Sequence, residues 1–264
     1  MMKIQFTNPI KLSILLLTIL LSSCATVSAP SERDPWESFN RSIYAFNDGI
    51  DRAVARPVAE AYQAVTPDFV ETGISNFFSN LDDIIVVVND LLQFKFKQAA
   101  QDLTRFVFNT TFGLLGFIDV ASEMELPKHR EDFGQTLATW GVGEGAYLVL
   151  PILGPSTVRD ATGTLVDGAF LDVVLTVEDD EARWSLIALR AIDNRAGLLE
   201  ATRIMEKSGI DPYVFMRDAY LQIRDNDIHD GNPPKAAIEQ PTQEDLELED
   251  ELEKALESSS PSSN

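Results

Sequence analysis

Apolar side chains recur at helical spacing behind Asp34-Pro35 and gather on one face of the chain. Aspartate is a residue type that caps helix N-termini, and proline fits the first turn because that turn leaves its N–H groups unbonded anyway. We therefore predict a helix that begins here and that ends or kinks at Pro57. Its apolar face comprises Phe39, Ile43, Phe46, Ile50 and Val54.

Two further apolar segments follow this helix. A second helical pattern begins near Pro67-Asp68, and it continues into a very apolar run at residues 84–92. Between residues 94 and 118 the apolar side chains are not confined to one face, so either a protein core or lipid must cover that helix. Gly113 and Gly116 are expected to mark its end.

The second half of the chain is more interrupted. Residues 134–155 are rich in glycine and proline and predict a loop followed by an extended segment. Ser156 or Thr157 is expected to cap a helix that runs towards Leu175. Acidic residues at 178–181 and the sequence 207–209 predict one helix of about thirty residues, roughly 45 Å long. Asp211-Pro212 then starts a last helix that fades by Asp227.

The N-terminus is typical of an exported lipoprotein. Lys3 and Lys11 flank a short apolar run at 12–21, which is too short to span a bilayer as a helix. Ser22 and Ser23 precede Cys24, the only cysteine of the chain. We predict a signal peptide at 1–23, diacylglycerol and acyl groups on Cys24, and a tether at 24–33. The alternative is an ordinary signal peptide with a cysteine nearby by chance.

The amino-acid composition limits the kinds of molecule that this chain can bind. From Cys24 onward the chain has 19 basic and 42 acidic residues, a net charge of -23, which disfavours nucleic acid as a partner. An anionic membrane surface would also repel it, so membrane attachment requires an anchor and apolar surface. A single cysteine excludes internal disulfides. Residues 226–264 are rich in acid, serine and proline and are expected to form a disordered tail.

Motifs for covalent catalysis are missing from the sequence: there is no Gly-x-Ser-x-Gly, no His-Glu-x-x-His and no phosphate-binding loop. His129 lies in a charged stretch and is interpreted as a solvated surface histidine. Residues 141–146 formally fit a dinucleotide fingerprint, but no strand–helix context surrounds them. Their glycines indicate either a mobile, tightly bent backbone or simple turns, and spacing alone does not decide between the two.

Several short motifs together resemble the MlaA (VacJ) family of outer-membrane lipoproteins, over residues 34–224 and in addition to the lipobox. The motifs, in order, are Phe39-Asn40-Arg41, Tyr44-x-Phe46-Asn47, Arg56-Pro57-Val58-Ala59, Ser75-Asn76-Phe77, Asn80-Leu81, Thr104-Arg105-Phe106, Asn109-Thr110, residues 116–121, Phe133-Gly134-x-Thr136-Leu137, Gly141-Val142-Gly143, Leu150-Pro151, Arg159-Asp160 and Asp211-Pro212-Tyr213.

This resemblance implies an all-α, ring-shaped protein embedded in the inner leaflet of the outer membrane, with a central amphipathic channel. Its helical domain would span residues 34–225. Such proteins remove glycerophospholipids that have strayed into the outer leaflet and pass them to a soluble periplasmic carrier, beside trimeric porins. No bond is broken and no cofactor is implied. The protein would face the periplasm of a Gram-negative cell, and Ala25 after the cysteine favours outer-membrane sorting.

The resemblance also implies site residues. Phe46 and Asn47 fall on the N-terminal helix whose placement governs the channel state. Gly141 and Gly143 fall on a channel-lining loop, which favours the mobile-backbone interpretation. Arg183 takes the place of a lysine near the channel and could contact a lipid phosphate.

Such a channel would lower a large free-energy barrier to phospholipid transfer. Moving a two-chain phospholipid into water exposes about 30 CH₂ groups, which costs ~25 kcal/mol. The chain has no nucleotide-binding loop, so the direction of flow would come from partners. The alternative function is a structural or scaffolding lipoprotein that conducts no lipid; a lipid hydrolase is poorly supported because no nucleophile and base can be paired.

Overall fold

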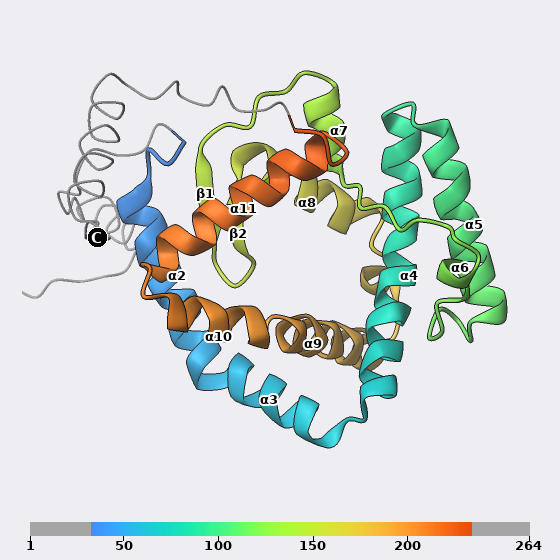
Figure 1. Ribbon diagram of the computed structural model, residues 1–264, viewed down its shortest axis with the longest axis horizontal. Helices are drawn as coiled ribbons and strands as arrows, with labels where there is room; N and C mark the ends of the chain where they lie inside the picture. Colours follow the sequence, from blue (N-terminus) through green and yellow to red (C-terminus); the bar gives the residue numbers. More distant parts are fainter. Residues whose placement is uncertain (1–32, 234–264) are drawn as a thin grey trace, which may run out of the picture. The chain divides into compact units, whose positions relative to one another are not determined.

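The computed structural model describes residues 33–233 (Figure 1). One compact unit ends at Ile223, and a second begins at Arg224. The predicted signal peptide, Cys24, residues 24–32 of the tether and the tail from residue 234 lie outside the described residues.

The described part of the chain is mainly helical, as expected for an all-α fold. The helical elements are α2 (Glu37–Ile50), the π-helix η1 (Asp51–Ala55), α3 (Arg56–Val65), α4 (Asp68–Leu92), α5 (Phe96–Phe112), α6 (Val120–Glu123), α7 (Phe133–Thr139), α8 (Val158–Phe170), the 3-10 helix η2 (Val173–Thr176), α9 (Asp180–Gly197), α10 (Leu199–Ser208) and α11 (Pro212–Ile228). The exception is an antiparallel hairpin of β1 (Tyr147–Leu150) and β2 (Gly154–Thr157), in which Tyr147 pairs with Thr157. Among residues 33–233, no helix has the length and apolar character needed to cross a membrane.

The start of α2 differs from the prediction. Trp36 is the N-cap residue and makes no side-chain capping bond. Asp34 is instead fully buried and accepts hydrogen bonds from Asn40 Nδ2 at 2.9 Å and from the Tyr213 hydroxyl at 2.6 Å. The prediction that Asp34 caps this helix is therefore wrong, because a buried carboxylate with distant donors satisfies its oxygens better than a local cap would.

Pro57 does not end the helical path. The chain continues from α2 into α3 through the π-helix, in which the Arg56 N–H bonds to the Asp51 carbonyl, five residues back. Proline lacks an N–H and clashes with the carbonyl four residues earlier in a regular α-helix. The wider π turn directly before Pro57 accommodates both effects. Pro57 therefore marks a change in the hydrogen-bond spacing of the helix and not its end.

The helices α4 and α5 form a hairpin and lie side by side (Figure 1). Both agree closely with the predicted segments, and α5 ends at Gly113 as expected. Gly116 has a φ of +92°, and a Cβ there would lie 2.5 Å from the Asn80 side chain. Gly73 on α4 likewise leaves space for the Phe117 ring. The chain after α5 therefore turns back tightly onto α4, which only glycines permit.

The second half of the chain contains both confirmed and corrected elements. Thr157 caps α8, since its hydroxyl accepts the Asp160 N–H at 3.2 Å, although α8 ends at Phe170 and not near Leu175. The short helix α7 lies inside the stretch that was expected to be loop, and β1 and β2 account for its predicted extended part.

The single long helix predicted for 178–208 is two helices, α9 and α10, which meet at Leu198. The break brings Leu199 into an apolar cluster with Ala59 and Ala196, against which Tyr62 packs. A second cluster consists of Tyr147, Val149, Tyr213 and Leu221, and joins the β-hairpin to α11. The predicted 45 Å length is wrong because packing against α3 decides the path of the chain here. The predicted helix end near 207–209 is confirmed, since α10 ends at Ser208 and Gly209 follows with a φ of +70°.

Candidate functional site

Asn47 attaches helix α2 to the β-hairpin. Its Nδ2 donates to the Leu150 carbonyl at 2.9 Å, and its Oδ1 accepts the Ile152 N–H at 2.8 Å. Asn40, two helical turns earlier on the same face, makes the equivalent contacts with main-chain groups three residues earlier in the chain. Its Nδ2 donates to the Tyr147 carbonyl at 3.0 Å, and its Oδ1 accepts the Val149 N–H at 2.9 Å. The two amides thus bond the main chain of the hairpin much as a neighbouring strand would.

Phe46 stands beside this attachment without taking part in it. Its side chain is 54% exposed, and Phe39 on the same helix and Val54 in η1 are exposed as well. Exposure of a large aromatic ring is costly in water and becomes favourable against an apolar neighbour. The predicted apolar face of α2 therefore exists, but much of it is not used in the core.

The glycine-rich segment 140–146 connects α7 to β1. Trp140 at its start donates from Nε1 to the Leu92 carbonyl at 3.1 Å, and Glu144 pairs with Arg33 at 2.8 Å. Gly141 has a φ of +86°, and neither Gly141 nor Gly143 has any atom within 4 Å of an added Cβ. Because this segment follows a helix and precedes a strand, the order of elements is opposite to that of a dinucleotide site.

Among the predicted site residues, the glycine segment and Asn47 lie at the two ends of β1, whereas Arg183 bonds within its own segment. Strand β1 begins one residue after the glycine segment and is held at its other end by Asn47. Arg183 has partners in its own segment: its Nη1 donates to the Val177 carbonyl at 2.9 Å, and its Nη2 pairs with Asp180. The guanidinium therefore stabilises the start of α9.

The α4–α5 hairpin has reversed polarity. Many polar side chains of its two helices are buried, whereas most large apolar side chains of α5 and of the turns at its two ends are exposed. The buried polar residues are Asn80, Asp83, Asn89, Asp90, Asp102, Arg105 and Asn109, and the exposed apolar ones are Leu91, Leu92, Phe94, Phe96, Leu103, Val107, Phe112, Leu114, Leu115 and Ile118. A protein surrounded by water arranges these two classes the other way round.

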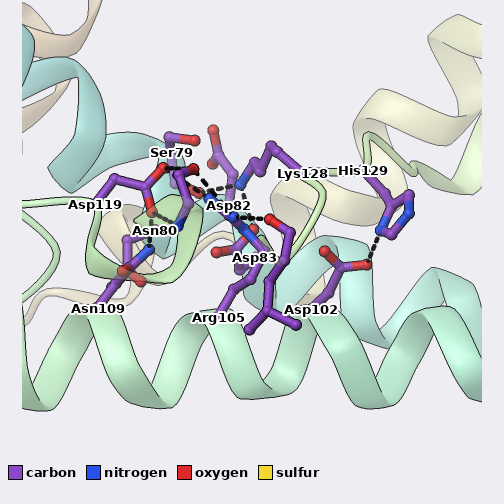
Figure 2. A network of polar contacts seen from close by, with 12 residues as sticks. Ser79, Asn80, Asp82, Asp83, Asp102, Arg105, Asn109, Asp119, Lys128 and His129 are labelled. Carbon is purple, nitrogen blue, oxygen red and sulfur yellow. Dashed lines mark hydrogen bonds and ion pairs between the residues drawn. The ribbon is translucent and has the colours of Figure 1, made fainter. Parts of the chain in front are cut away.

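Several of the buried polar side chains take part in a network of polar contacts (Figure 2). Arg105 lies at its centre, with Nη2 2.8 Å from Asp119 Oδ2 and Nη1 2.5 Å from the Leu126 carbonyl. Asn109 donates to Asp119 Oδ1 at 3.0 Å and accepts the Ala121 N–H at 2.9 Å. Burial opposes ionisation of Asp119, but hydrogen bonds from Ser122, Asn109 and Arg105 outweigh it and lower its pKa to about 2.

Residues 124–132, the segment that follows α6, are fastened to the hairpin by charged groups. Lys128 pairs with the buried Asp83, and His129 Nδ1 lies 2.7 Å from Asp102 Oδ2 (Figure 2). Glu131, buried as well, accepts from Lys95 at 2.8 Å. The interpretation of His129 as a solvated surface residue is therefore wrong: its ring is about three-quarters buried and serves as the partner of a fully buried carboxylate.

Sequence reasoning missed this polar network, although the pattern contains a signal for it. Asn80, Asp83 and Asp90 recur at helical spacing in α4, and Asp102, Arg105 and Asn109 do so in α5. Each series lies along one side of its helix. Such stripes normally face water, and only the paired helices reveal that these two face each other.

Comparison with known proteins agrees with the fold and its motifs. A family model described as MlaA lipoprotein matches residues 32–227. An Escherichia coli (strain K12) protein named "Intermembrane phospholipid transport system lipoprotein MlaA" is 40% identical over 219 residues, which cover 79% of this chain and 84% of that protein. An uncharacterized protein from Rickettsia felis is 36% identical over 192 residues, covering 73% of this chain and 76% of the relative.

A solved structure, described as "Structural basis for maintenance of bacterial outer membrane lipid asymmetry", is similar with a TM-score of 0.64 and 34% identity. The match covers 74% of this chain and 98% of the solved one. Sequence, motif order and fold thus agree over the same part of the molecule. The chain belongs to the MlaA lipoprotein family.

Proposed function

We propose that this protein maintains the lipid asymmetry of an outer membrane by retrieving glycerophospholipids that have strayed into the outer leaflet. In this proposal it is anchored by acyl groups on Cys24 in the inner leaflet of a Gram-negative outer membrane. Lipids pass through a central amphipathic channel of a ring-shaped helical body to a soluble periplasmic carrier. A trimeric porin holds the protein in place, and no covalent chemistry takes place.

The observation that carries the proposal is the reversed polarity of the α4–α5 hairpin in a chain whose relatives are named as phospholipid transport lipoproteins. Each large apolar side chain that moves from water into an apolar environment contributes about 1.5–3 kcal/mol. A row of exposed phenylalanines and leucines therefore favours a position among acyl chains. With no helix among residues 33–233 long and apolar enough to span the bilayer, residence in a single leaflet is the arrangement that we infer.

The site residues acquire roles within this proposal. Asn47 holds the β-hairpin to α2, so a shift of α2 would move β1 and with it the glycine segment. Gly141 and Gly143 have open space around them, which suits a segment that lines the lipid path and bends as a headgroup passes. Phe46, exposed beside Asn47, would contact acyl chains.

Arg183 has a weaker claim to a direct role. Its guanidinium is engaged by Asp180 and the Val177 carbonyl, so it would have to exchange one of these partners for a lipid phosphate. The chain has no nucleotide-binding loop, so we attribute the direction of transport to the affinity of the carrier.

Outer-leaflet phospholipid in a deletion strain tests the proposal. We expect it to rise several-fold, to return to normal with the wild-type gene, and to stay high with Gly143→Val at an unchanged protein level. Gly143 suits this test because its φ is ordinary and an added side chain meets no atom within 4 Å.

Gly168→Ala in α8 is the matched control, since its added Cβ makes only an ordinary contact of 3.8 Å with Leu175, and we expect it to restore asymmetry. Normal asymmetry in the deletion strain would contradict lipid retrieval and would favour a scaffolding role. Loss of the Gly143→Val protein from the membrane would mean that the segment is structural.

A further inference from the structure

Asp90 is a fully buried carboxyl group near the end of α4 that lacks a hydrogen-bond donor. Its relative exposure is 0%, and neither of its side-chain oxygens is bonded by a donor group in the part of the chain that the structure describes. The charged groups that act on it are Asp102 from α5, Glu131 from the segment 124–132 and Lys95 from the turn between the helices. Two of these three groups are acidic.

The neighbouring carboxylates already have their own partners. Asp83 pairs with Lys128, and Glu131 accepts from Lys95 at 2.8 Å and from Gln93 at 2.8 Å. The Nδ1 atom of His129 lies 2.7 Å from Asp102 Oδ2. Lys95 and Lys128 thus each form an ion pair with a carboxylate other than Asp90.

Asp102 supplies the complementary acceptor. With a proton on Nδ1, His129 donates to Oδ2, and Asp102 is the acceptor of that bond. The other oxygen, Oδ1, is buried and has no donor among residues 33–233. One proton placed between Asp90 and Asp102 would satisfy both orphaned groups at once, whereas two adjacent buried carboxylates would repel each other.

The surroundings of Asp90 also favour its protonated form. Burial, together with the negative charges of Asp102 and Glu131, raises the pKa of Asp90 to about 8. A carboxyl group in such a setting keeps its proton at neutral pH.

We propose that Asp90 is a carboxylic acid that donates its proton to Asp102, and that this shared proton fastens residues 124–132 to the α4–α5 hairpin in a pH-dependent way. Those residues contribute Lys128, His129 and Glu131 to the cluster and lead directly into α7. The proton therefore controls the anchorage of the chain that precedes the glycine segment. This inference does not depend on the transport proposed above.

The direction of the pH effect follows from linkage. When the segment opens, Asp90 returns to an ordinary pKa near 4, so the open state releases the proton more readily than the closed state. The contribution of this group to closure is complete below about pH 4, is lost progressively as the pH rises to about 8, and is constant above that.

Hydrogen exchange of the full-length protein in lipid nanodiscs tests the proposal. After correction for intrinsic exchange rates, we expect the protection of amides in 124–132 to fall up to about tenfold per pH unit between about pH 5.5 and 7.5, and to level off above about pH 8.5. In Asp90→Asn, which keeps a neutral donor towards Asp102, this slope should disappear and protection near pH 8 should exceed that of the wild type.

Asp83→Asn is the matched control on the same helix. It removes the partner of Lys128, so it should lower protection at every pH and retain the slope. Wild-type protection without a pH slope, or an equal slope in Asp90→Asn, would overturn the proposal. If Asp90→Asn does not fold, infrared difference spectra of the wild type decide: a protonated-carboxyl band near pH 6 that is lost by about pH 10 supports the shared proton, and its absence refutes it.

Discussion

The α4–α5 hairpin and the region around β1 bury polar groups for different reasons. Around β1, an apolar cluster of Tyr147, Val149 and Tyr213 forms a conventional interior, and the buried amide of Asn40 serves the backbone of the strand. In the α4–α5 hairpin many polar side chains are buried beside a few apolar ones such as Phe78 and Val86, and many large apolar side chains are exposed. The first region is built as in a water-soluble domain, whereas the second presents an apolar outer face that contact with water disfavours.

This difference shows which interactions hold each region together. In the hairpin, burial of apolar area contributes little between the helices, so charge-assisted hydrogen bonds such as that of Arg105 to Asp119 carry more of the cohesion. Around β1, hydrophobic contacts dominate and the amides fix the register. Substitutions in the two regions should consequently have different effects.

Arg105→Met should have the largest effect on stability. It keeps the aliphatic volume, but it leaves the Leu126 carbonyl without its donor and removes the charged donor to Asp119, so we expect a loss of about 3–5 kcal/mol in the free energy of unfolding. Urea unfolding in detergent micelles measures it. Arg52→Met, which removes a mostly exposed ion pair with Asp48, should cost less than about 1 kcal/mol. Equal losses in the two variants would show that the polar interior is not what holds the hairpin.

Asn40→Ala should follow, with a loss of about 2–3 kcal/mol. The Val149 N–H loses its acceptor, and the Asp34 carboxylate and the Tyr147 carbonyl each lose a donor in a fully buried setting. Asn47→Ala should cost about 1–2 kcal/mol, because the Ile152 N–H is near solvent. Faster hydrogen exchange confined to the Val149 amide in the first variant and to the Ile152 amide in the second would confirm the attachment; unchanged exchange at both would contradict it.

Phe112→Gln should barely change stability but should weaken membrane binding. Its ring is 66% exposed, so we expect the free energy of unfolding to change by less than about 0.5 kcal/mol. In a chain with Cys24→Ala, which removes the site of the proposed anchor, binding to phospholipid vesicles should fall about tenfold or more. Phe78→Gln is the control: that ring is 3% exposed, and its loss should destabilise the fold by about 3–5 kcal/mol. Unchanged vesicle binding by Phe112→Gln would remove the argument for a lipid-facing side.

Local chemistry allowed the sequence to predict many of the element boundaries. Thr157 caps α8, Gly113 follows α5, and Gly209 follows α10, each as expected. These residues act on neighbours within a few positions, so no knowledge of the fold is needed to predict their effect. The order of short motifs also identified the family, and the glycine segment was correctly separated from a dinucleotide site.

Only the tertiary structure decided what the polar residues do. Asp34 serves Asn40 and Tyr213 instead of a helix cap, His129 joins Asp102, and Asn40 and Asn47 bond a strand more than a hundred residues away. A short polar side chain can satisfy its oxygens locally or at a distance, and the choice depends on which groups the folded chain brings close. Once the side chain is buried, losing that partner is costly, because a polar group without a hydrogen bond in the interior is unfavourable.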